Sequence, residues 1–289
     1  MPKPKVYFTK DISPTGLAKV YEALDAQPHG KIAVKISSGE KGGHHYLQPA
    51  LIKDLIQSVN GTIVECNTAY GGARGNSKEH WQVIEEHGFD QIAPVDLMDE
   101  NGEIEIPVKK HRQIAYDVIG KNFANYDYVL VLSHFKGHIA GGFGGAIKNI
   151  SIGIASSRGK LWIHNAGAGD SEWMKGVAQD DFLEAMAEAA LAIIDYKGPQ
   201  NFAYVNVLNN LSVDCDCDPN AAEPDMHDLG ILSSLDPIAL DQASVDLVYQ
   251  APDSRSLKTR IEEKNGLHTL EYAASELGLG SLDYELISV

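Results

Sequence analysis

The sequence predicts a three-layer α/β protein with a largely parallel or mixed central sheet. Short runs rich in β-branched and aromatic residues alternate with longer runs whose apolar residues recur at helical spacing. One run, YDYVLVLSHF at residues 126–135, is apolar almost without a break, which is typical of a strand covered on both faces. Such alternation builds sheets with helices on both sides. We expect a single domain over residues 1–289, and a change of character near residue 198 would divide it into two lobes.

The first half of the chain alternates regularly between the two kinds of element. The expected strands are KVYFT at 5–9, KIAVKIS at 31–37 and TIVECNT at 62–68, and the expected helices are TGLAKVYEALDA at 15–26, PALIKDLIQSV at 49–59 and NSKEHWQVIEEHG at 76–88. The second of these helices begins at a proline, which suits the first helical turn. The third begins at an Asn-Ser pair and ends at a glycine, which are common start and stop signals.

The second half continues the alternation, with a helix at 180–196, strands at 202–211 and 230–234, and a helix at 236–250. The last helix begins with Asp236 as N-cap and Pro237 at the first helical position.

One residue of the helix at 236–250 is unusual for its position. The helical period places Asp241 on the same face as Ile238 and Val245, so its carboxylate is expected to face inward. A buried carboxylate needs a partner, and a lysine or histidine of the glycine-rich segment described next would supply it. In the alternative interpretation, Asp241 is partly exposed and favours the helix dipole.

The segment KGHIAGGFGGAIKN at residues 136–149 is the strongest candidate for a binding site. Its glycines permit close approach of a ligand to the backbone, and the helix expected to follow offers free N–H groups to an anion. The segment matches neither the dinucleotide-binding nor the P-loop pattern. The candidate site residues in it are Lys136, His138, Gly144, Gly145, Lys148 and Asn149. Alternatively, the glycines form a tight turn and the lysines face solvent.

Further polar residues follow other predicted strands. His164 comes after the short apolar run LWI, which we interpret as a strand that ends at the same edge of the sheet. Lys35 and Arg74 lie at or beyond the ends of the strands at 31–37 and 62–68, and Arg74 suits recognition of a carboxylate or phosphate. Because the carboxyl ends of parallel strands share one edge, we expect these side chains to border one cleft. Each residue taken alone could also be structural.

The run VDCDCDPN at 213–220 places Cys215 and Cys217 among carboxylates. Thiolates select zinc, iron or copper(I), so the pair is a candidate set of metal ligands. The set would be completed by His227, Asp225 or the distant histidines His138 and His164. Neighbouring carboxylates would raise the pKa of both thiols. A Cys-x-Cys pair is poorly suited to a mutual disulfide. A reactive dithiol and a purely structural role are the alternatives.

Composition argues against several classes of partner. The chain carries 24 basic and 40 acidic residues, a net charge of −16, which repels nucleic acids and anionic lipid surfaces. The N-terminal MPKPKVYFTKD lacks the apolar core of a signal peptide, and no stretch approaches the ~20 apolar residues of a membrane span. We therefore expect a cytoplasmic protein that binds neither nucleic acid nor membrane.

Several blocks of the sequence resemble the DUF362 family, whose members are often labelled Fe–S center proteins. These blocks are VKISSGEKGGHHYLQPALI, NTAYGGARGNSKEHW, SHFKGHIAGGFGGAIKNISIGIASSRGKLWIH, VDCDCDP and DLGILSSLDPIALDQASVDLV. Many members carry a ferredoxin-type module after the segment that matches IHNAGAG, but this chain has no such run of cysteines. No intrinsic ferredoxin-type 4Fe–4S cluster is therefore expected. A cluster would come from an iron–sulfur partner protein or use the cysteines present.

A shorter resemblance concerns the spacing of three residues around the glycine-rich segment. His138, Lys148 and His164 are spaced as in the nickel-pincer lactate racemase family. In that family the first histidine is the acid/base, the lysine anchors a pyridinium-derived nickel cofactor covalently, and the last histidine ligates the nickel. The resemblance implies the same roles here, and imidazole is a suitable ligand for nickel.

Two hypotheses follow from these observations. In the first, which we favour, the protein is an isomerase-like, racemase-like or redox enzyme that acts on a small anion. A nickel, iron or zinc ion would bind near His164, Cys215 and Cys217. Lys136, Lys148 and Arg74 would hold the anion, and His138 would transfer protons. In the second, the protein is a non-catalytic metal or iron–sulfur accessory, or a redox carrier, that serves a partner.

Overall fold

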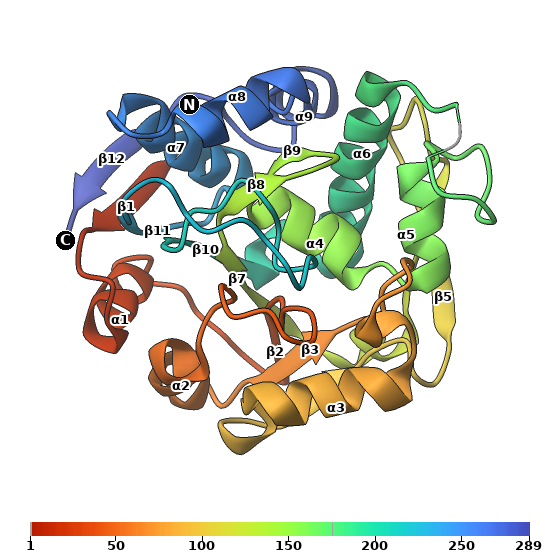
Figure 1. Ribbon diagram of the computed structural model, residues 1–289, viewed down its shortest axis with the longest axis horizontal. Helices are drawn as coiled ribbons and strands as arrows, with labels where there is room; N and C mark the ends of the chain where they lie inside the picture. Colours follow the sequence, from red (N-terminus) through yellow and green to blue (C-terminus); the bar gives the residue numbers. More distant parts are fainter. Residues whose placement is uncertain (1, 175) are drawn as a thin grey trace.

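The computed structural model describes residues 2–174 and 176–289 and confirms the predicted three-layer α/β architecture (Figure 1). Among these residues, eight strands form one sheet in the order β12-β1-β11-β10-β7-β2-β3-β4. The strands are β1 (Lys5–Thr9), β2 (Ile32–Lys35), β3 (Thr62–Glu65), β4 (Val95–Leu97), β7 (Tyr128–His134), β10 (Phe202–Leu208), β11 (Gly230–Ser234) and β12 (Glu285–Ser288). The edge strands β4 and β12 lie outside the set that the sequence predicts.

The sheet is mixed and mostly parallel. Strands β10, β7, β2, β3 and β4 run parallel to one another. Strand β11 runs antiparallel to both of its neighbours, β1 and β10, and Tyr7 of β1 lies opposite Ser233. The outermost strand, β12, is parallel to β1. One sheet thus combines strands from both sides of residue 198.

Helices cover both faces of the sheet (Figure 1). One face carries α1 (Pro14–Glu22), α2 (Pro49–Ser58) and α3 (Ser77–His87), and the other side carries α4 (Ala146–Ile154), α5 (Ser157–His164), α6 (Gln179–Lys197), α7 (Pro237–Gln250), α8 (Arg255–Glu263) and α9 (His268–Tyr272). The predicted N-cap of α7 is confirmed, since the Asp236 side chain accepts hydrogen bonds from the N–H groups of Ile238 and Ala239. No helix of the described part of the chain combines the length and apolar character needed to cross a membrane.

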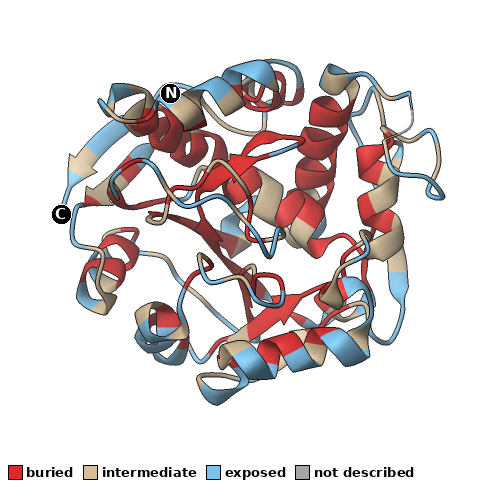
Figure 2. Cartoon of the chain, in the orientation of Figure 1, coloured by how far each residue is buried: buried red, intermediate tan, exposed pale blue. Residues whose placement is uncertain are grey.

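The central strand β7 is buried along its whole length, as its unbroken apolar run predicts (Figure 2). Val129 and Val131 belong to the hydrophobic core on the α4 side, whereas Leu130 and Leu132 belong to the core on the α1–α3 side. Burying one such side chain stabilises the folded state by ~1.5–3 kcal/mol. This strand therefore holds the two layers of helices to the same sheet.

Two small antiparallel pairs lie outside the main sheet. Strand β5 (Glu103–Pro107) pairs with β6 (Tyr116–Gly120), and β8 (Lys136–His138) pairs with β9 (Gly142–Gly144). The second pair is a hairpin between β7 and α4, formed by the glycine-rich segment. Its strands keep their backbone groups paired, so the glycine-rich segment has a defined shape.

Candidate active site

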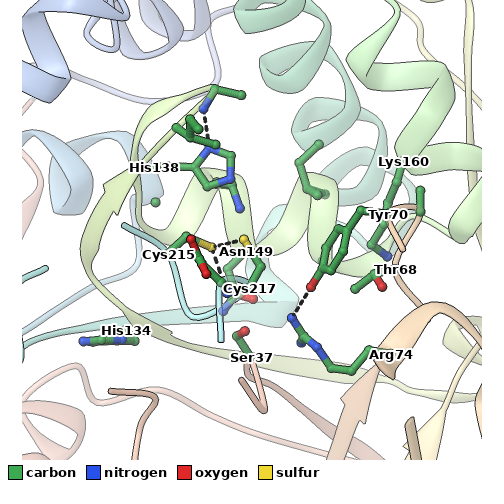
Figure 3. Close-up of a pocket in the computed structure, with 18 of the residues that line it drawn as sticks. Ser37, Thr68, Tyr70, Arg74, His134, His138, Asn149, Lys160, Cys215 and Cys217 are labelled. Atoms are coloured by element: carbon green, nitrogen blue, oxygen red, sulfur yellow. Dashed lines mark hydrogen bonds between the residues drawn. The ribbon is translucent and has the colours of Figure 1, made fainter. Parts of the chain in front are cut away.

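A cavity of about 400 Å³ lies at the carboxyl ends of β2, β3 and β7 (Figure 3). Ser37 follows β2, Thr68 follows β3 and His134 ends β7, and all three line it. The remaining walls come from the β8–β9 hairpin, the first turns of α4, the end of α5 and the loop that carries the cysteine pair. This edge of a parallel sheet is where α/β proteins usually bind ligands.

All of the predicted site residues except Asp241 line this cavity. They are Lys35, Arg74, Lys136, His138, Gly144, Gly145, Lys148, Asn149, His164, Cys215 and Cys217. The predicted convergence of distant segments on one cleft therefore holds for these residues, although their contacts differ from those expected.

Asp241 faces inward, as its helical position predicts, and is fully buried. The predicted partner is wrong, because its carboxylate accepts hydrogen bonds from the backbone N–H groups of Ala146 and Ile147 at 2.8 and 3.0 Å and from Asn206 Nδ2 at 2.7 Å. Burial raises the pKa of Asp241, and the three hydrogen bonds limit that rise, so that the pKa is about 6. The carboxylate is therefore ionised at neutral pH. The start of α4, which we expected to bind an external anion, thus already binds an internal one.

At two positions of the glycine-rich segment, neighbouring atoms come so close to the backbone that only glycine fits. A Cβ at Gly145 would lie 2.3 Å from Asp241 Oδ1, so only glycine lets the capping carboxylate reach the helix. A Cβ at Gly137 would lie 2.2 Å from the Val213 carbonyl oxygen. The Gly137 N–H donates instead to the Ser212 carbonyl at 2.8 Å, which places the cysteine loop directly on the hairpin.

His138 is buried in the cavity wall with one ring nitrogen committed to the backbone (Figure 3). Its Nδ1 accepts from the N–H groups of Ala140 and Gly141 at 3.2 and 2.9 Å. Because Nδ1 is an acceptor, the proton of the neutral ring lies on Nε2. Burial and Lys148 lower the pKa of His138 to about 4. His138 therefore presents an N–H donor at neutral pH.

His164 lies at the end of a helix, so the predicted strand at LWI is wrong. The Ser156 side chain caps this helix by accepting from the Gly159 N–H, and three apolar residues do not distinguish a strand from a helix. The His164 Nδ1 lies 2.6 Å from the Lys160 carbonyl and must donate to it, which leaves the lone pair on Nε2. Burial lowers the pKa of His164 to about 3. His138 and His164 are thus both neutral but carry opposite tautomers.

Asp216, between the two cysteines, anchors their loop to the end of β7. Its carboxylate lies 2.9 Å from His134 Nδ1 and 2.9 Å from Lys136 Nζ. Burial opposes ionisation, but His134 and Lys136 hold the pKa of Asp216 well below its usual range. Burial would lower the pKa of Lys136, but Asp216 raises it, so the amine stays charged. Lys136, which we predicted to bind an anion, already has a carboxylate partner.

Cys215 and Cys217 face each other with their sulfur atoms 2.7 Å apart (Figure 3). The hydrogen bond between the two thiols holds the pKa of Cys215 well below its usual value despite burial, and Lys148 and His138 act in the same direction. The same hydrogen bond raises the pKa of Cys217. The expectation that neighbouring carboxylates would raise both pKa values is therefore wrong for Cys215, since the charge of Asp216 is neutralised by its own partners.

Arg74 belongs to a buried network of charges at the other side of the cavity. It lies 3.4 Å from Glu65 Oε2 and 3.7 Å from Glu40 Oε2, and it donates to the Tyr70 hydroxyl at 2.9 Å (Figure 3). Burial opposes its charge, but Tyr70, Glu65 and Glu40 raise the pKa of Arg74. Its positive charge is therefore neutralised within the protein, in contrast to the predicted role in recognising an external anion.

Three lysines in the cavity have no carboxylate within ion-pair distance among the described residues. Lys35 donates to Asn149 Oδ1 at 3.1 Å, and burial lowers its pKa to about 8. Lys160 donates to the Ala155 carbonyl at 2.5 Å, and burial likewise lowers its pKa. The side-chain amine of Lys148 has neither a hydrogen bond nor an ion pair within the part of the chain that the structure describes. The cavity thus concentrates positive charge in a protein whose net charge is −16.

Sequence reasoning missed Glu65 and Asp216 and gave Lys160 no role. Glu65 is a buried carboxylate at the end of β3 that accepts from the Ser38 N–H at 2.6 Å and lies 3.0 Å from His80 Nε2. A charged residue inside the apolar run TIVEC was the available signal, since an ion at such a position needs built-in partners. No comparable pattern distinguishes Asp216 from the other aspartates of DCDCD.

A stability measurement tests the charged state of Lys160. The substitution Lys160→Met is expected to raise the free energy of unfolding by about 1–2 kcal/mol at pH 7, because it removes a buried amine without a carboxylate partner. The pKa of Lys160 is lower in the folded than in the unfolded chain, so the gain should shrink as pH rises through the folded-state pKa. Urea denaturation followed by circular dichroism measures both effects.

The control for this substitution is Lys78→Met on the exposed surface of α3, which should leave stability within about 0.5 kcal/mol at every pH. A lower free energy of unfolding for Lys160→Met than for the wild type at pH 7 would contradict this expectation. Lys160 would then be held by a favourable charge contact that the geometry does not show.

Residues 32–246 match the family described as a domain of unknown function, DUF362. A search of curated proteins finds no match. Among solved structures, the lactate racemase apoprotein from Thermoanaerobacterium thermosaccharolyticum is 13% identical with a TM-score of 0.49, covering 86% of this chain and 57% of that one. A Thermotoga maritima structural-genomics protein is 10% identical with a TM-score of 0.45, covering 87% of this chain and 58% of that one.

This chain therefore spans less than two thirds of the length of either solved protein, and neither likeness assigns it an activity. The family match covers well over half of the chain and confirms the resemblance seen in the sequence blocks. The chain belongs to the DUF362 family.

Proposed function

We propose that the protein is a metal-dependent enzyme that acts on a small anionic substrate in the cavity at the carboxyl edge of the sheet. The observation that carries the proposal is that soft metal donors and lysines without carboxylate partners face the same enclosed space. A volume of about 400 Å³ suits a small molecule, since ligand pockets usually measure ~300–1,000 Å³.

The donor set is typical of a transition-metal site. Cys215, Cys217 and His138 each offer an atom within 4.8 Å of the others, and thiolate with imidazole selects zinc, iron or nickel over magnesium or calcium. Three protein ligands leave a position for substrate, as in catalytic zinc sites. At this position a metal would supply a Lewis acid that polarises a substrate oxygen.

The hydrogen bonds of the two histidines decide which imidazole suits the metal. A ligating nitrogen needs its lone pair, and His138 would have to move its proton to Nδ1, where two backbone N–H groups already point. His164 donates from Nδ1 to a carbonyl and keeps the Nε2 lone pair, which is the arrangement of most metal-ligating histidines. We therefore assign the N–H donor to His138 and the imidazole ligand to His164, which lines the same cavity but lies outside the compact group that His138 forms with the two thiols.

His138 then has a different chemical role from the proton transfer first expected. A neutral imidazole whose Nδ1 accepts backbone N–H groups does not take up a proton at neutral pH. Its Nε2–H can donate to negative charge that develops on a substrate oxygen or on the Cys215 sulfur, as neutral histidines do in some isomerases. Its pKa of about 4 keeps this donor neutral across the physiological pH range.

The anion would be held by Lys35, Lys148 and Lys160. Lys35 and Lys160 are more than nine-tenths buried, and the more distant carboxylate of Glu65 only partly offsets the burial that lowers their pKa values. A bound carboxylate or phosphate would supply a nearer counter-ion. Lys148 lies one turn into α4, and its partnerless amine also suits the covalent attachment that the spacing resemblance to lactate racemase implies.

Metal analysis of anaerobically purified native protein tests the proposal. We expect about one nickel, iron or zinc ion per chain, which is lost in the double variant Cys215→Ser/Cys217→Ser and in His164→Ala but retained in His138→Ala. Mass spectrometry of the same sample measures any adduct on Lys148.

The control is Cys66→Ser, since Cys66 is buried and donates to the Ile154 carbonyl at 3.2 Å. Wild-type protein that holds no metal, or a double cysteine variant that holds as much as the wild type, would contradict the proposal. Bound metal without turnover on any small anion would favour the carrier hypothesis.

A further inference from the structure

The two sulfur atoms of the cysteine loop are already close to bonding distance. Cys215 and Cys217 Sγ are 2.7 Å apart, and a disulfide requires ~2.05 Å, so roughly 0.7 Å separates the two arrangements. The sequence alone argues against such a bond, because a Cys-x-Cys pair is poorly suited to a mutual disulfide. The structure instead folds residues 215–218 into a turn in which the Asp218 N–H donates to the Cys215 carbonyl at 2.9 Å.

This turn is held from several sides. The carboxylate of Asp216 is bound by His134 and Lys136 from the end of β7. Arg260 of α8 donates to the Val213 carbonyl at 2.8 Å just before the turn. The Cys217 N–H also lies 3.3 Å from the Cys215 sulfur. The fold thus fixes the pair in a near-reactive geometry before any chemistry occurs, which removes much of the entropic cost of closing the ring.

The pair is also accessible. Cys215 is buried but borders the cavity, and Cys217 is partly exposed and borders the same cavity. A small disulfide can therefore reach a sulfur through the space that we assign to the substrate. Cys66 also lines the cavity, but it is 3% exposed and its thiol donates to the Ile154 carbonyl, so it offers an internal comparison.

We propose that Cys215 and Cys217 form a reversible dithiol–disulfide pair that exchanges with low-molecular-weight disulfides. One sulfur attacks the disulfide RSSR, forms a mixed disulfide and releases RS⁻. The second sulfur then attacks the mixed disulfide, closes the Cys215–Cys217 bond and releases the other RS⁻. Two protein thiols lose two protons and two electrons, and RSSR is reduced to two RSH.

This exchange would also regulate the metal site, a consequence that rests on the proposed function. Metals bind thiolates, and a disulfide sulfur has no thiolate charge to offer. Oxidation would therefore withdraw two ligands at once, leaving the imidazole and the lysines in place. The cavity would bind metal only while the pair is reduced.

The experiment exposes the reduced, metal-free full-length protein to millimolar oxidised glutathione without oxygen. Free thiols are then alkylated, and the peptides are measured by mass spectrometry. We expect the peptide with both cysteines to escape alkylation and lose about 2 Da, while Cys66 is alkylated once the protein is unfolded. Reduction with dithiothreitol should restore two alkylation sites. Cys217→Ser should stop at a mixed disulfide with glutathione or fail to react.

The outcomes separate this inference from the proposed function. A wild-type peptide that keeps two free thiols, or accumulates glutathione without closing, overturns the exchange. Zn²⁺ binding to the reduced and oxidised forms is measured by calorimetry in parallel. Binding that is equal in both forms overturns the regulation. If the disulfide closes but the reduced form binds no Zn²⁺, the proposed metal site fails and the exchange stands.

Discussion

Replacing Asp241 by alanine is expected to lower the free energy of unfolding by about 3–5 kcal/mol, the largest loss of stability that we predict for a single polar residue. Its carboxylate satisfies the first two N–H groups of α4 and the Asn206 amide, and all of these groups are buried. The substitution would leave three donors without acceptors at the start of a helix inside the core. Urea denaturation followed by circular dichroism measures the loss.

Asp236→Ala provides a matched comparison. Asp236 also accepts backbone N–H groups at a helix start, but it caps its own helix α7 and is only partly buried. Removing it should lower stability by about 0.5–2 kcal/mol, as is usual for local N-caps. If Asp241→Ala were no more destabilising than Asp236→Ala, the tertiary cap of α4 would contribute little, and the start of that helix would be free to bind an external anion.

The second large effect concerns binding. Lys148→Ala is expected to weaken the binding of a small dianion by about 100-fold or more, because it removes a charge-assisted contact inside an enclosed cavity. Among the described residues the Lys148 amine makes no hydrogen bond or ion pair, so its removal should not change stability. Calorimetry with oxalate and with inorganic phosphate on the metal-free protein measures the affinity.

Two further variants sharpen this test. Lys53→Ala, on the exposed surface of α2, should leave the affinity unchanged and so controls for the lower net charge. Lys148→Arg keeps the charge and should retain most of the affinity. Unchanged binding by Lys148→Ala, together with an unaltered fold, would place the anion elsewhere in the cavity or outside it.

The sequence predicts the layers of this fold because its strongest signals are local. The apolar run of β7, the Asp-Pro start of α7 and the glycine after α3 each act through neighbouring residues. The errors arise where the local signal is weak. The run LWI is too short to show a period, and the hairpin β8–β9 contains too few side chains to reveal strands.

The candidate site is predictable in its location but not in its contacts. Parallel strands place Lys35 and His134 at one edge, which needs no knowledge of distant partners. The partner of Asp241 lies 95 residues away, and the partner of His134 lies 82 residues away. Which lysine has a carboxylate partner and which has none depends on such long-range pairs, and no spacing in the sequence encodes them.

The pairing of β1 has a consequence for how the protein is made. Strand β1 leaves the ribosome before the other described strands of the sheet, yet its two neighbours are β11 and β12, and Tyr7 pairs with Ser233. Strands β2, β3 and β7 can assemble while synthesis continues, whereas β1 must wait until more than 200 further residues have been added. During that interval its unpaired edge is open to wrong partners, so nascent chains should need a chaperone most before β11 emerges.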